Sequence, residues 1–513
     1  MKKNIIYISI ALGWMAAASS CQHELNLAPV SSISNGNYWK TPDQFDAFVS
    51  GIMSAFRSGT NNFELLGELR ADVFGTDPGS NSAFTGEATQ GIEHLWLNTL
   101  DGNNPGVSDF GGFYFNINQI NLLISKLNST NVVSQTNKNY YLGMAYGLRA
   151  FYYFQMLKSW GKCIIQTDPT TSFDLSKLAK PASGTDSVMA LIKSDISLSE
   201  QSFGSDFSFR NQKSYWSLPA TLMLKAHVYL WTAHRNGGTA DAQTALSALN
   251  DIQQNVPPLQ LLPDFASVFA SNNKGNNEVI FAIHNQLNEG NGLPFAGTFE
   301  PQSNLIVNFY DSVDNRQFNV TQDNWGGLLR APVMISTFRR FNNLDQRKWV
   351  SITAAYNLVG GQYQIAGCFA SKYQGEQNAG SRVYTNDYPI YRYAGLLLLK
   401  AEAEVILGQS PANEINMVRQ RAYGANYNPA VEGYPNQPID KNPDPFEAIL
   451  QERYFEFVFE GKRWYDLRRM GDKYVYEYTT VTPAESYMLL WPIDRNTLTN
   501  NPDLQQNPGY PLF

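Results

Sequence analysis

Cysteine and histidine are almost absent from this chain of 513 residues, which contains three cysteines and five histidines. Cys163 and Cys368 lie far apart without any repeated spacing, so the sequence has no disulfide framework, and we expect two free, buried thiols. His227 and His234 lie seven residues apart on one predicted helix. This spacing is compatible with a metal pair but is more typical of structural histidines. No CxxC or HExxH motif occurs, and we expect neither a metal nor a cofactor.

Long hydrophobic runs are also scarce, and the only one stands at the start of the chain. Two lysines precede an apolar stretch over residues 5–18. A stretch of this length is too short for a membrane span, which needs about 20 residues. Small residues and then Cys21 follow it, as in a bacterial export signal. We expect residues 1–20 to be a lipoprotein signal peptide, Cys21 to carry lipid, and residues 21–40 to form a lipid-anchored tether. An ordinary secretory signal with an accidental cysteine is the alternative.

Charge is sparse and shows no basic excess. Charged residues make up 16% of the chain, whose net charge is −7. Loss of Lys2 and Lys3 with the leader would bring the net charge to −9, and an acidic chain lacks the cationic face that nucleic acid requires. Aromatic residues are abundant instead, with 28 Tyr, 30 Phe and 10 Trp. A surface rich in aromatic and amide side chains suits a neutral polar ligand.

Helical periodicity dominates most of the remaining chain. Thr41-Pro42-Asp43-Gln44 is typical of a helix start, and apolar residues follow at helical spacing up to Gly59. Further helices are predicted over residues 113–127, 139–160, 187–201, 218–233, 240–254, 391–407, 412–422 and 445–469. Several of these helices form pairs joined by short turns, although no strict 34-residue period is present. The sequence therefore predicts a mostly α fold built as a tetratricopeptide-like scaffold of stacked helical hairpins.

Three stretches lack this periodicity, namely residues 60–104, 259–390 and 473–513. They are rich in Gly, Asn, Pro and aromatic residues, with short strand-like pieces such as residues 278–283. We predict long loops and small β elements here, and binding sites usually lie on such loops. Since no linker is evident, we expect residues 41–513 to form a single domain. Its loop-rich, ligand-binding part would comprise approximately residues 60–104 and 259–390.

One segment near the C-terminus carries a distinctive sequence motif. Residues 451–469, QERYFEFVFEGKRWYDLRR, closely resemble the hallmark segment of the SusD/RagB family of outer-membrane lipoproteins of Bacteroidetes. Similar pieces lie in order along the chain, at residues 37–41, 147–154, 160–161, 391–394, 400–403, 416–419, 491–493, 501–502 and 507–510. The resemblance covers nearly all of the chain that follows the leader.

The resemblance implies a function as well as a SusD-like fold. Proteins of this family are not enzymes. They sit in the outer membrane facing the cell exterior, where they bind oligosaccharides or, in some members, peptides. They act as a lid over a SusC-like TonB-dependent transporter that imports the nutrient. We therefore expect a glycan-binding lipoprotein of polysaccharide utilisation, with an oligopeptide as the alternative ligand.

The hallmark segment itself is interpreted as structural. Glu456 and Glu460 share a helix face, but Arg453 and Arg463 lie beside them at ion-pairing distance along the helix. Paired carboxylates that hydrolyse glycosides must flank a sugar in a cleft. We expect no catalysis here, and we expect Gly461 to allow a close approach of another backbone segment.

The first candidate ligand contacts lie in the early loop region. A sugar is held by an aromatic ring and by polar side chains at its hydroxyls. Arg70, Asp72 and Asp77 are candidates for hydrogen bonding, Trp96 for stacking and Asn98 for bridging. An equally supported alternative places Trp96 in the core and makes Arg70–Asp72 a local ion pair.

The second candidate is Trp325, which stands beside two glycines in a loop that we expect to be flexible. Tyr310 lies nearby, but residues 305–316 resemble a core segment of the SusD/RagB family. The sequence therefore favours Trp325 over Tyr310 as a ligand contact.

Overall fold

The computed structural model describes residues 38–76, 84, 91–108, 110–171, 179–289, 293 and 296–511. The predicted signal peptide, Cys21, nearly all of the predicted tether, and Asp77 lie outside the described residues.

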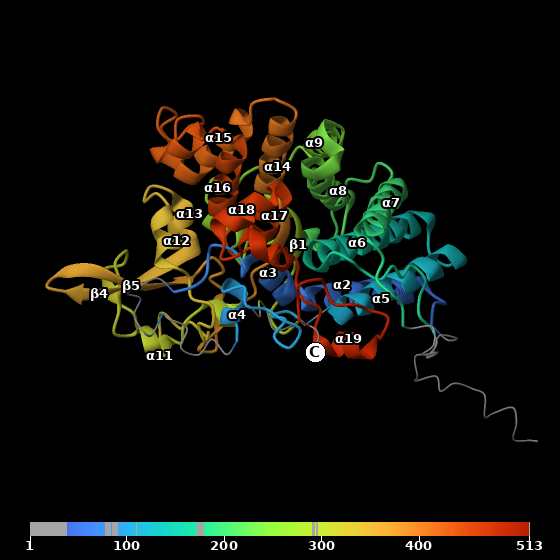
Figure 1. The fold of residues 1–513 in the computed structure, drawn as a ribbon, viewed down its shortest axis with the longest axis horizontal. Helices are drawn as coiled ribbons and strands as arrows, with labels where there is room; N and C mark the ends of the chain where they lie inside the picture. Colours follow the sequence, from blue (N-terminus) through green and yellow to red (C-terminus); the bar gives the residue numbers. More distant parts are fainter. Residues whose placement is uncertain are drawn as a thin grey trace, which may run out of the picture.

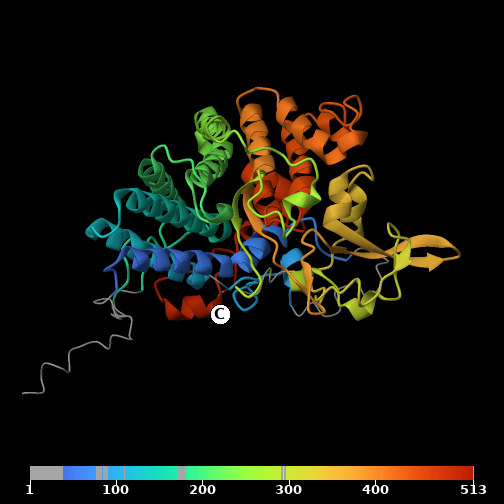
Figure 2. The same ribbon diagram turned by 180° about the vertical axis from the view of Figure 1, so that it is seen from behind.

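The helical scaffold confirms the predicted fold class, and its helices pack in sequence-adjacent pairs (Figure 1). The paired helices are α5 (Phe110–Ser129) with α6 (Gln135–Trp160), α6 with α7 (Thr185–Phe203), α8 (Leu218–Thr232) with α9 (Gly238–Asn255), and α14 (Tyr393–Ile406) with α15 (Ala412–Tyr423). Helix α2 (Pro42–Ser58) packs against α5 and runs along the base of this array in Figure 2. The array forms a frame for the loop-rich part of the chain.

The predicted loop regions contain helices that the sequence analysis missed. Gly59 keeps a right-handed helical backbone, with φ of −80°, so the chain turns directly into α3 (Thr60–Glu68). Seven of the nine residues of α3 are buried, and tertiary packing rather than periodicity stabilises so short a helix. The other short helices of these regions are α4 (Glu93–Trp96), α10 (Ala296–Phe299), α11 (Ser303–Ile306), α12 (Ile335–Arg340), α13 (Gln346–Ser351), α18 (Asp472–Tyr478) and α19 (Arg495–Asn500).

The predicted helix over residues 445–469 is wrong in its continuity. It is divided into α16 (Pro445–Phe457) and α17 (Arg463–Met470). The chain between them turns around the end of α3, where Glu68 accepts hydrogen bonds from the backbone N–H groups of Phe459 and Lys462 at 3.0 and 3.1 Å. These bonds replace the intrahelical ones that a continuous helix would make.

The close approach expected at Gly461 is present in this turn. Gly461 has a φ of +64°, in the left-handed region that favours glycine. A Cβ atom added to Gly67 of α3 would lie 1.7 Å from the carbonyl oxygen of Gly461. Both positions therefore need glycine for the turn to lie against α3.

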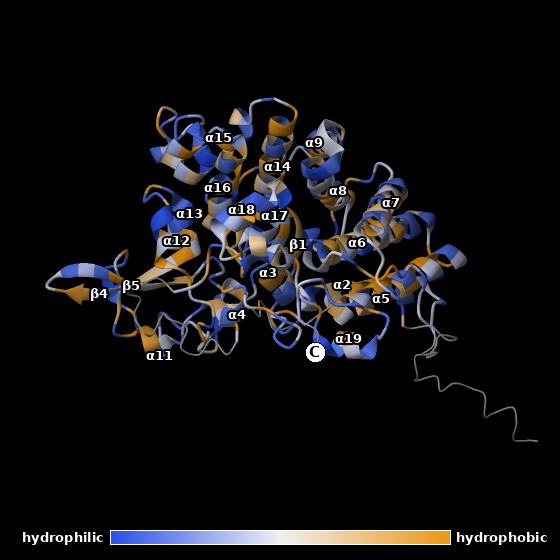
Figure 3. Ribbon diagram, in the orientation of Figure 1, coloured by the Kyte–Doolittle hydropathy of each residue, from blue (hydrophilic) through white to orange (hydrophobic). Residues whose placement is uncertain are grey.

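Charged side chains are buried where this turn, α16 and their neighbours meet. Helix α17 carries many hydrophilic residues in Figure 3, yet all eight of its residues are buried. Glu456 lies at the centre, and its carboxylate accepts hydrogen bonds from Arg347 at 3.0 Å, from Arg392 at 2.5 Å and from Arg421. Although burial opposes ionisation, these three arginines hold the pKa of Glu456 well below its usual range.

The pairs extend outward from Glu456 into what we call the arginine–glutamate network. Glu460 pairs with Lys372 at 2.6 Å and with Arg392 at 2.8 Å. The members of the network are Glu278, Asp345, Arg347, Lys372, Arg392, Arg419, Arg421, Asp440, Glu452, Glu456 and Glu460. Glu456 and Glu460 are thus saturated with cations, in agreement with the structural role expected from the sequence. Their partners are not the expected Arg453 and Arg463, which pair with Asp466 and Asp72 because the helix is divided.

The β elements of the described residues are small and form three sheets. Strand β1 (Val279–Ile283) is wholly buried and pairs antiparallel with β8 (Tyr388–Arg392), which leads into α14. A four-stranded antiparallel sheet has the order β3-β2-β4-β5. Its strands are β2 (Tyr310–Asp311), β3 (Arg316–Gln317), β4 (Ile352–Val359) and β5 (Gln362–Ala370), and a separate hairpin joins β6 (Glu376–Asn378) to β7 (Ser381–Val383). The β4–β5 hairpin projects from the left end of the molecule in Figure 1.

Buried apolar residues form two clusters. The larger one draws on nearly every helix of the scaffold. The smaller one lies at the four-stranded sheet and comprises Phe84, Ile306, Phe309, Phe318, Trp325, Leu329, Ala355, Ala366 and Phe369. Cys163 and Cys368 are free and buried, as predicted.

The Glu456→Gln substitution tests the role of the arginine–glutamate network. It leaves three buried arginines short of a carboxylate, and breaking a buried pair costs about 3–5 kcal/mol. We expect chemical denaturation at pH 7 to show a loss of this size. Glu200→Gln is the control, because its half-buried pair with Lys225 is worth about 0–1 kcal/mol. Equal stability of the two variants would contradict a structural role for the network.

Candidate ligand-binding site

Arg70 and Asn98, two of the predicted ligand contacts, lie in the interior. Arg70 is 0% and Asn98 2% exposed, and the guanidinium donates to the Asn98 side-chain oxygen at 2.8 Å. Arg70 also lies over the ring of Trp464 at 4.2 Å. The structure brings the two residues together, but as an internal contact, and neither side chain presents a free group on the surface.

Asp72 and Trp96 are likewise engaged within the protein. The alternative interpretation required an ion pair between Asp72 and Arg70, and the two residues do not form one. Asp72 instead accepts hydrogen bonds from Arg463 at 2.7 Å and Arg340 at 2.9 Å. These arginines lower the pKa of Asp72 although burial opposes them. Trp96 is 9% exposed and belongs to the main core cluster. Of the two interpretations given for Trp96, its position fits the core one.

Trp325 lines a surface cleft beside the four-stranded sheet. Its ring packs edge-on against Phe369 at 5.4 Å, and the Arg382 guanidinium lies over it at 4.1 Å. The indole is 7% exposed, and its Nε1–H has no hydrogen-bond partner among the described residues. Gly327 is held by a close approach, since an added Cβ would lie 2.0 Å from the carbonyl oxygen of Glu300. Trp325 is therefore a wall of the cleft on a fixed loop, not the flexible platform expected from the sequence.

The cleft has a volume of about 310 Å³, which lies at the lower end of the range for small-molecule sites. It lies between β2, β3, the loop that carries Trp325, α13, the start of β4 and the β6–β7 hairpin. Its polar and aromatic lining includes Asp311, Ser312, Asp314, Arg316, Gln322, Asp323, Trp325, Trp349, Thr353, Tyr356, Gln374 and Arg382.

Trp349 is the exposed aromatic ring of this cleft. It is 40% exposed, and its Nε1–H donates to the Asn343 carbonyl at 2.9 Å, which fixes the indole orientation. Trp349 lies on α13, which begins after Asp345, whose side chain accepts a hydrogen bond from the Arg347 N–H at 2.9 Å. Trp349 was not among the residues predicted from the sequence, because only the fold distinguishes an exposed tryptophan beside a cleft from the buried ones.

The arginine–glutamate network fixes the helix that carries Trp349. Arg347, two residues earlier on α13, is 1% exposed and pairs with Glu452 at 2.7 Å and Glu456 at 3.0 Å on α16. With one side of α13 held by these buried pairs, the opposite side faces the cleft. The orientation of Trp349 is thus coupled to the interior of the scaffold.

Hydrogen-bond donors and acceptors lie in the cleft together with the Trp349 ring. Arg316 and Asp323 form a bidentate pair at 2.6 and 2.9 Å, which lowers the pKa of Asp323 although burial opposes it. Asp311, Gln322 and Gln374 add carboxylate and amide groups. An aromatic ring beside carboxylate, amide and guanidinium groups matches the apolar face and the hydroxyls of a sugar ring.

No metal centre accompanies the cleft within the described residues. In this part of the chain, no group of three or more His, Cys, Asp or Glu side chains is placed to hold a metal ion. The two histidines with metal-like spacing face different partners. His234 lies 3.1 Å from Glu402, and His227 stacks on Tyr391 with ring centroids 5.6 Å apart.

Comparison with known proteins identifies the family of this fold. The sequence model of the SusD family matches residues 270–510. The solved structure of B. fragilis NanU is 44% identical and covers 95% of this chain and 100% of its own, with a TM-score of 0.87. The chain belongs to the SusD family.

Other members of the SusD family span the chain equally well. A SusD superfamily protein from Bacteroides vulgatus is 39% identical over 92% of this chain and all of its own, with a TM-score of 0.84. SusD-like protein P38 of Formosa agariphila is 27% identical over 99% of both chains. The residues matched by the SusD family model include every residue that lines the cleft.

Trp96→Ala distinguishes the two interpretations of Trp96. Because the ring is buried in the core, we expect its removal to cost about 3–5 kcal/mol of folding free energy. Chemical denaturation measures this loss. A variant that keeps its stability and instead loses ligand affinity would return Trp96 to the ligand site.

Proposed function

We propose that this protein captures oligosaccharides at the outer surface of the outer membrane and delivers them, as a lid, to a SusC-like TonB-dependent transporter. The cleft beside Trp349 and Trp325 is the proposed ligand site. The single observation that carries this assignment is the exposed indole of Trp349, held in place beside carboxylate, amide and guanidinium groups. A sugar ring would lie against the indole while its hydroxyls bind the polar groups.

Similarity to a protein with a known ligand supports a glycan over an oligopeptide. A protein of Bacteroides thetaiotaomicron named starch-binding protein SusD is 30% identical over 132 residues, which make up 24% of this chain. Peptide backbones would also use the amide and carboxylate groups of the cleft. The oligopeptide is therefore kept as an outcome of the binding test and not as a second proposal.

The proposal includes no chemical step. Glycoside hydrolysis needs two carboxyl groups beside the sugar, one of which has a raised pKa. Asp323 in the cleft is paired with Arg316 and its pKa is lowered. Glu456 and Glu460 are enclosed by arginine and lysine side chains. A turnover of substrate in a binding assay would overturn this part of the proposal.

The proposed anchor is lipid on Cys21. No helix among the described residues is both long and apolar enough to cross a membrane. The acyl chains on one cysteine can hold a folded domain at a bilayer. In this proposal residues 22–37, which lie outside the described residues, would link the lipid to the domain that begins near Tyr38.

Trp349→Ala tests the ligand site. Removal of a ring that stacks on the ligand weakens binding by about 1–3 kcal/mol. We expect calorimetric titration with a panel of neutral oligosaccharides and peptides to show saturable sugar binding that this variant weakens by that amount.

Phe115→Ala is the matched control for Trp349→Ala. Phe115 is 63% exposed and lies on α5, away from the cleft. The control should bind as the unaltered protein does. Equal affinity of both variants would remove Trp349 from the site, and saturable peptide binding without sugar binding would replace the proposed ligand class.

Cys21→Ala tests the anchor. Without the thiol no lipid can be attached, so we expect the variant to leave the membrane fraction while its circular dichroism and thermal unfolding stay unchanged. Fractionation in cells that lack the partner transporter makes this measurement. Continued membrane association there would show that another feature anchors the protein.

A further inference from the structure

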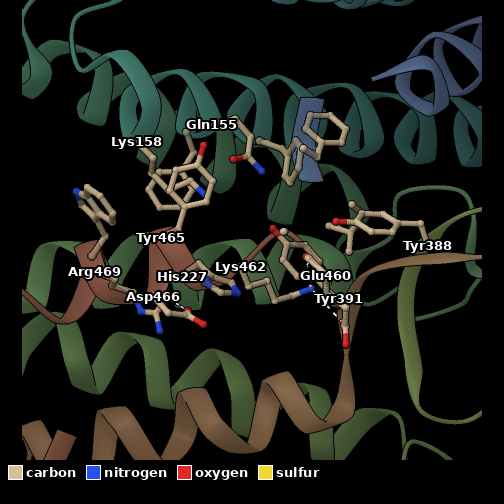
Figure 4. A pocket seen from close by; sticks show the side chains of 16 residues that line it. Gln155, Lys158, His227, Tyr388, Tyr391, Glu460, Lys462, Tyr465, Asp466 and Arg469 are labelled. Carbon is tan, nitrogen blue, oxygen red and sulfur yellow. Dashed lines mark hydrogen bonds and ion pairs between the residues drawn. The ribbon is translucent and has the colours of Figure 1, made fainter. Parts of the chain in front are cut away.

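A small chamber lies inside the scaffold, away from the cleft beside Trp349. It opens to solvent and is lined by side chains from α3, α6, α8, β8 and α17 and from the turn that precedes α17 (Figure 4). Its volume is about 60 Å³. Phe63, Phe151, Phe154 and Ile390 provide apolar walls. A site for one water needs roughly 10–15 Å³, so the chamber has room for more than one water molecule.

Two basic side chains in this chamber contact aromatic rings but have no ion-pair partner among the described residues. Lys158 of α6 lies with its ammonium 3.8 Å from the ring centroid of Tyr465 and 4.8 Å from that of Phe154. His227 of α8 stacks on Tyr391. Within the described part of the chain, neither side chain makes a hydrogen bond or an ion pair, and both retain some accessible surface. Gln155, which reaches down from α6 in Figure 4, also makes no side-chain hydrogen bond there.

The carboxylates of the chamber are already shared among other cations. Asp466 pairs with Arg453 at 2.8 Å and with Arg469 at 2.7 Å. Glu460 pairs with Lys372, Arg392 and Lys462 at 2.6, 2.8 and 3.4 Å. Neither acid is left to pair with Lys158, so its protonated ammonium has no carboxylate partner among the described residues.

The lowered pKa values of Lys158 and His227 agree with the lack of a carboxylate partner. Burial, together with the nearby Arg469, lowers the pKa of Lys158 to about 7, although Asp466 partly opposes the shift. Burial lowers the pKa of His227 well below its usual value, and Arg469, Arg453, Lys158 and Lys462 add to the shift. The lowered pKa values show that the chamber disfavours the protonated forms of both groups, and a bound anion would favour the protonated Lys158 ammonium.

We propose that this chamber is a binding site for a short-chain carboxylate of the size of acetate, with the Lys158 ammonium as its main ligand. The carboxylate supplies the missing negative charge and accepts hydrogen bonds from Lys158 and from the Gln155 amide. The apolar walls receive the alkyl end of the ligand, which distinguishes a carboxylate from an inorganic anion. The volume excludes an oligosaccharide, so this site is separate from the cleft.

Thermal unfolding of the purified full-length protein in sodium acetate, with sodium chloride as the reference at equal ionic strength, tests the proposal. We expect acetate to raise the unfolding temperature saturably. A charged hydrogen bond is lost in Lys158→Met, so this variant should bind acetate about tenfold more weakly or not at all. Lys441→Met is the control, because Lys441 is exposed and does not line the chamber.

A second measurement uses the unaltered protein and does not depend on the folding of a variant. At pH 8 the Lys158 amine is mostly neutral before acetate binds, and the bound anion raises its pKa. Calorimetry in two buffers of different ionisation enthalpy should therefore show uptake of nearly one proton for each acetate bound.

Each result of these two experiments either supports or overturns the proposal. Saturable acetate binding with proton uptake, lost in Lys158→Met and kept in Lys441→Met, supports the proposal. Absence of any effect beyond that of chloride would mean that the chamber holds only water. Binding without proton uptake, or with full strength in Lys158→Met, would place the acetate elsewhere. Either of these last two results overturns the proposal.

Discussion

The convergence of three arginines on the buried carboxylate of Glu456 is the constraint on which the rest of the structure depends. Arg347, Arg392 and Arg421 come from α13, from the end of β8 and from α15, three parts of the chain far apart in sequence. Each arginine also contacts another carboxylate, but among the described residues Glu456 is the one group that pairs with all three, so it links the elements that carry them in one arrangement. The hallmark segment of the SusD family thus connects elements that lie far apart in the sequence.

The ion pairs around Glu456 also connect the helical scaffold to the proposed ligand site. Arg347 and Trp349 lie on opposite sides of α13, one paired in the interior and the other exposed beside the cleft. A ring that is already oriented loses little conformational freedom when a ligand stacks on it, and preorganisation of this kind favours affinity. The same hallmark segment, through Tyr465 and Asp466, forms a wall of the chamber around Lys158. One segment therefore supports both of the proposed sites.

Much of the scaffold could be predicted from the sequence, because its helices carry apolar residues at helical spacing and begin at recognisable caps such as Thr41 to Gln44. The short helix α3 could not, since burial stabilises it more than its own pattern does. The division between α16 and α17 depends on Glu68, some 390 residues away, which accepts the backbone N–H groups of the turn. Pairings at this sequence distance leave no local signal.

The candidate site shows the same limit. Trp325 could be associated with the site region, but whether a tryptophan is a core residue, a wall or an exposed platform depends on what packs against each face. Arg70, Trp96 and Asn98 have the chemistry of a sugar site and are used inside the protein instead. Trp349 has no distinctive sequence context, and its exposure follows from the burial of Arg347 on the other side of α13.

Hydrogen–deuterium exchange with and without a bound oligosaccharide tests the placement of the site most directly. We expect the ligand to slow exchange in residues 311–325 and 349–356, which contain residues that line the cleft, and to leave residues 93–98 unchanged. Slower exchange confined to residues 93–98, with none at the cleft, would contradict this placement.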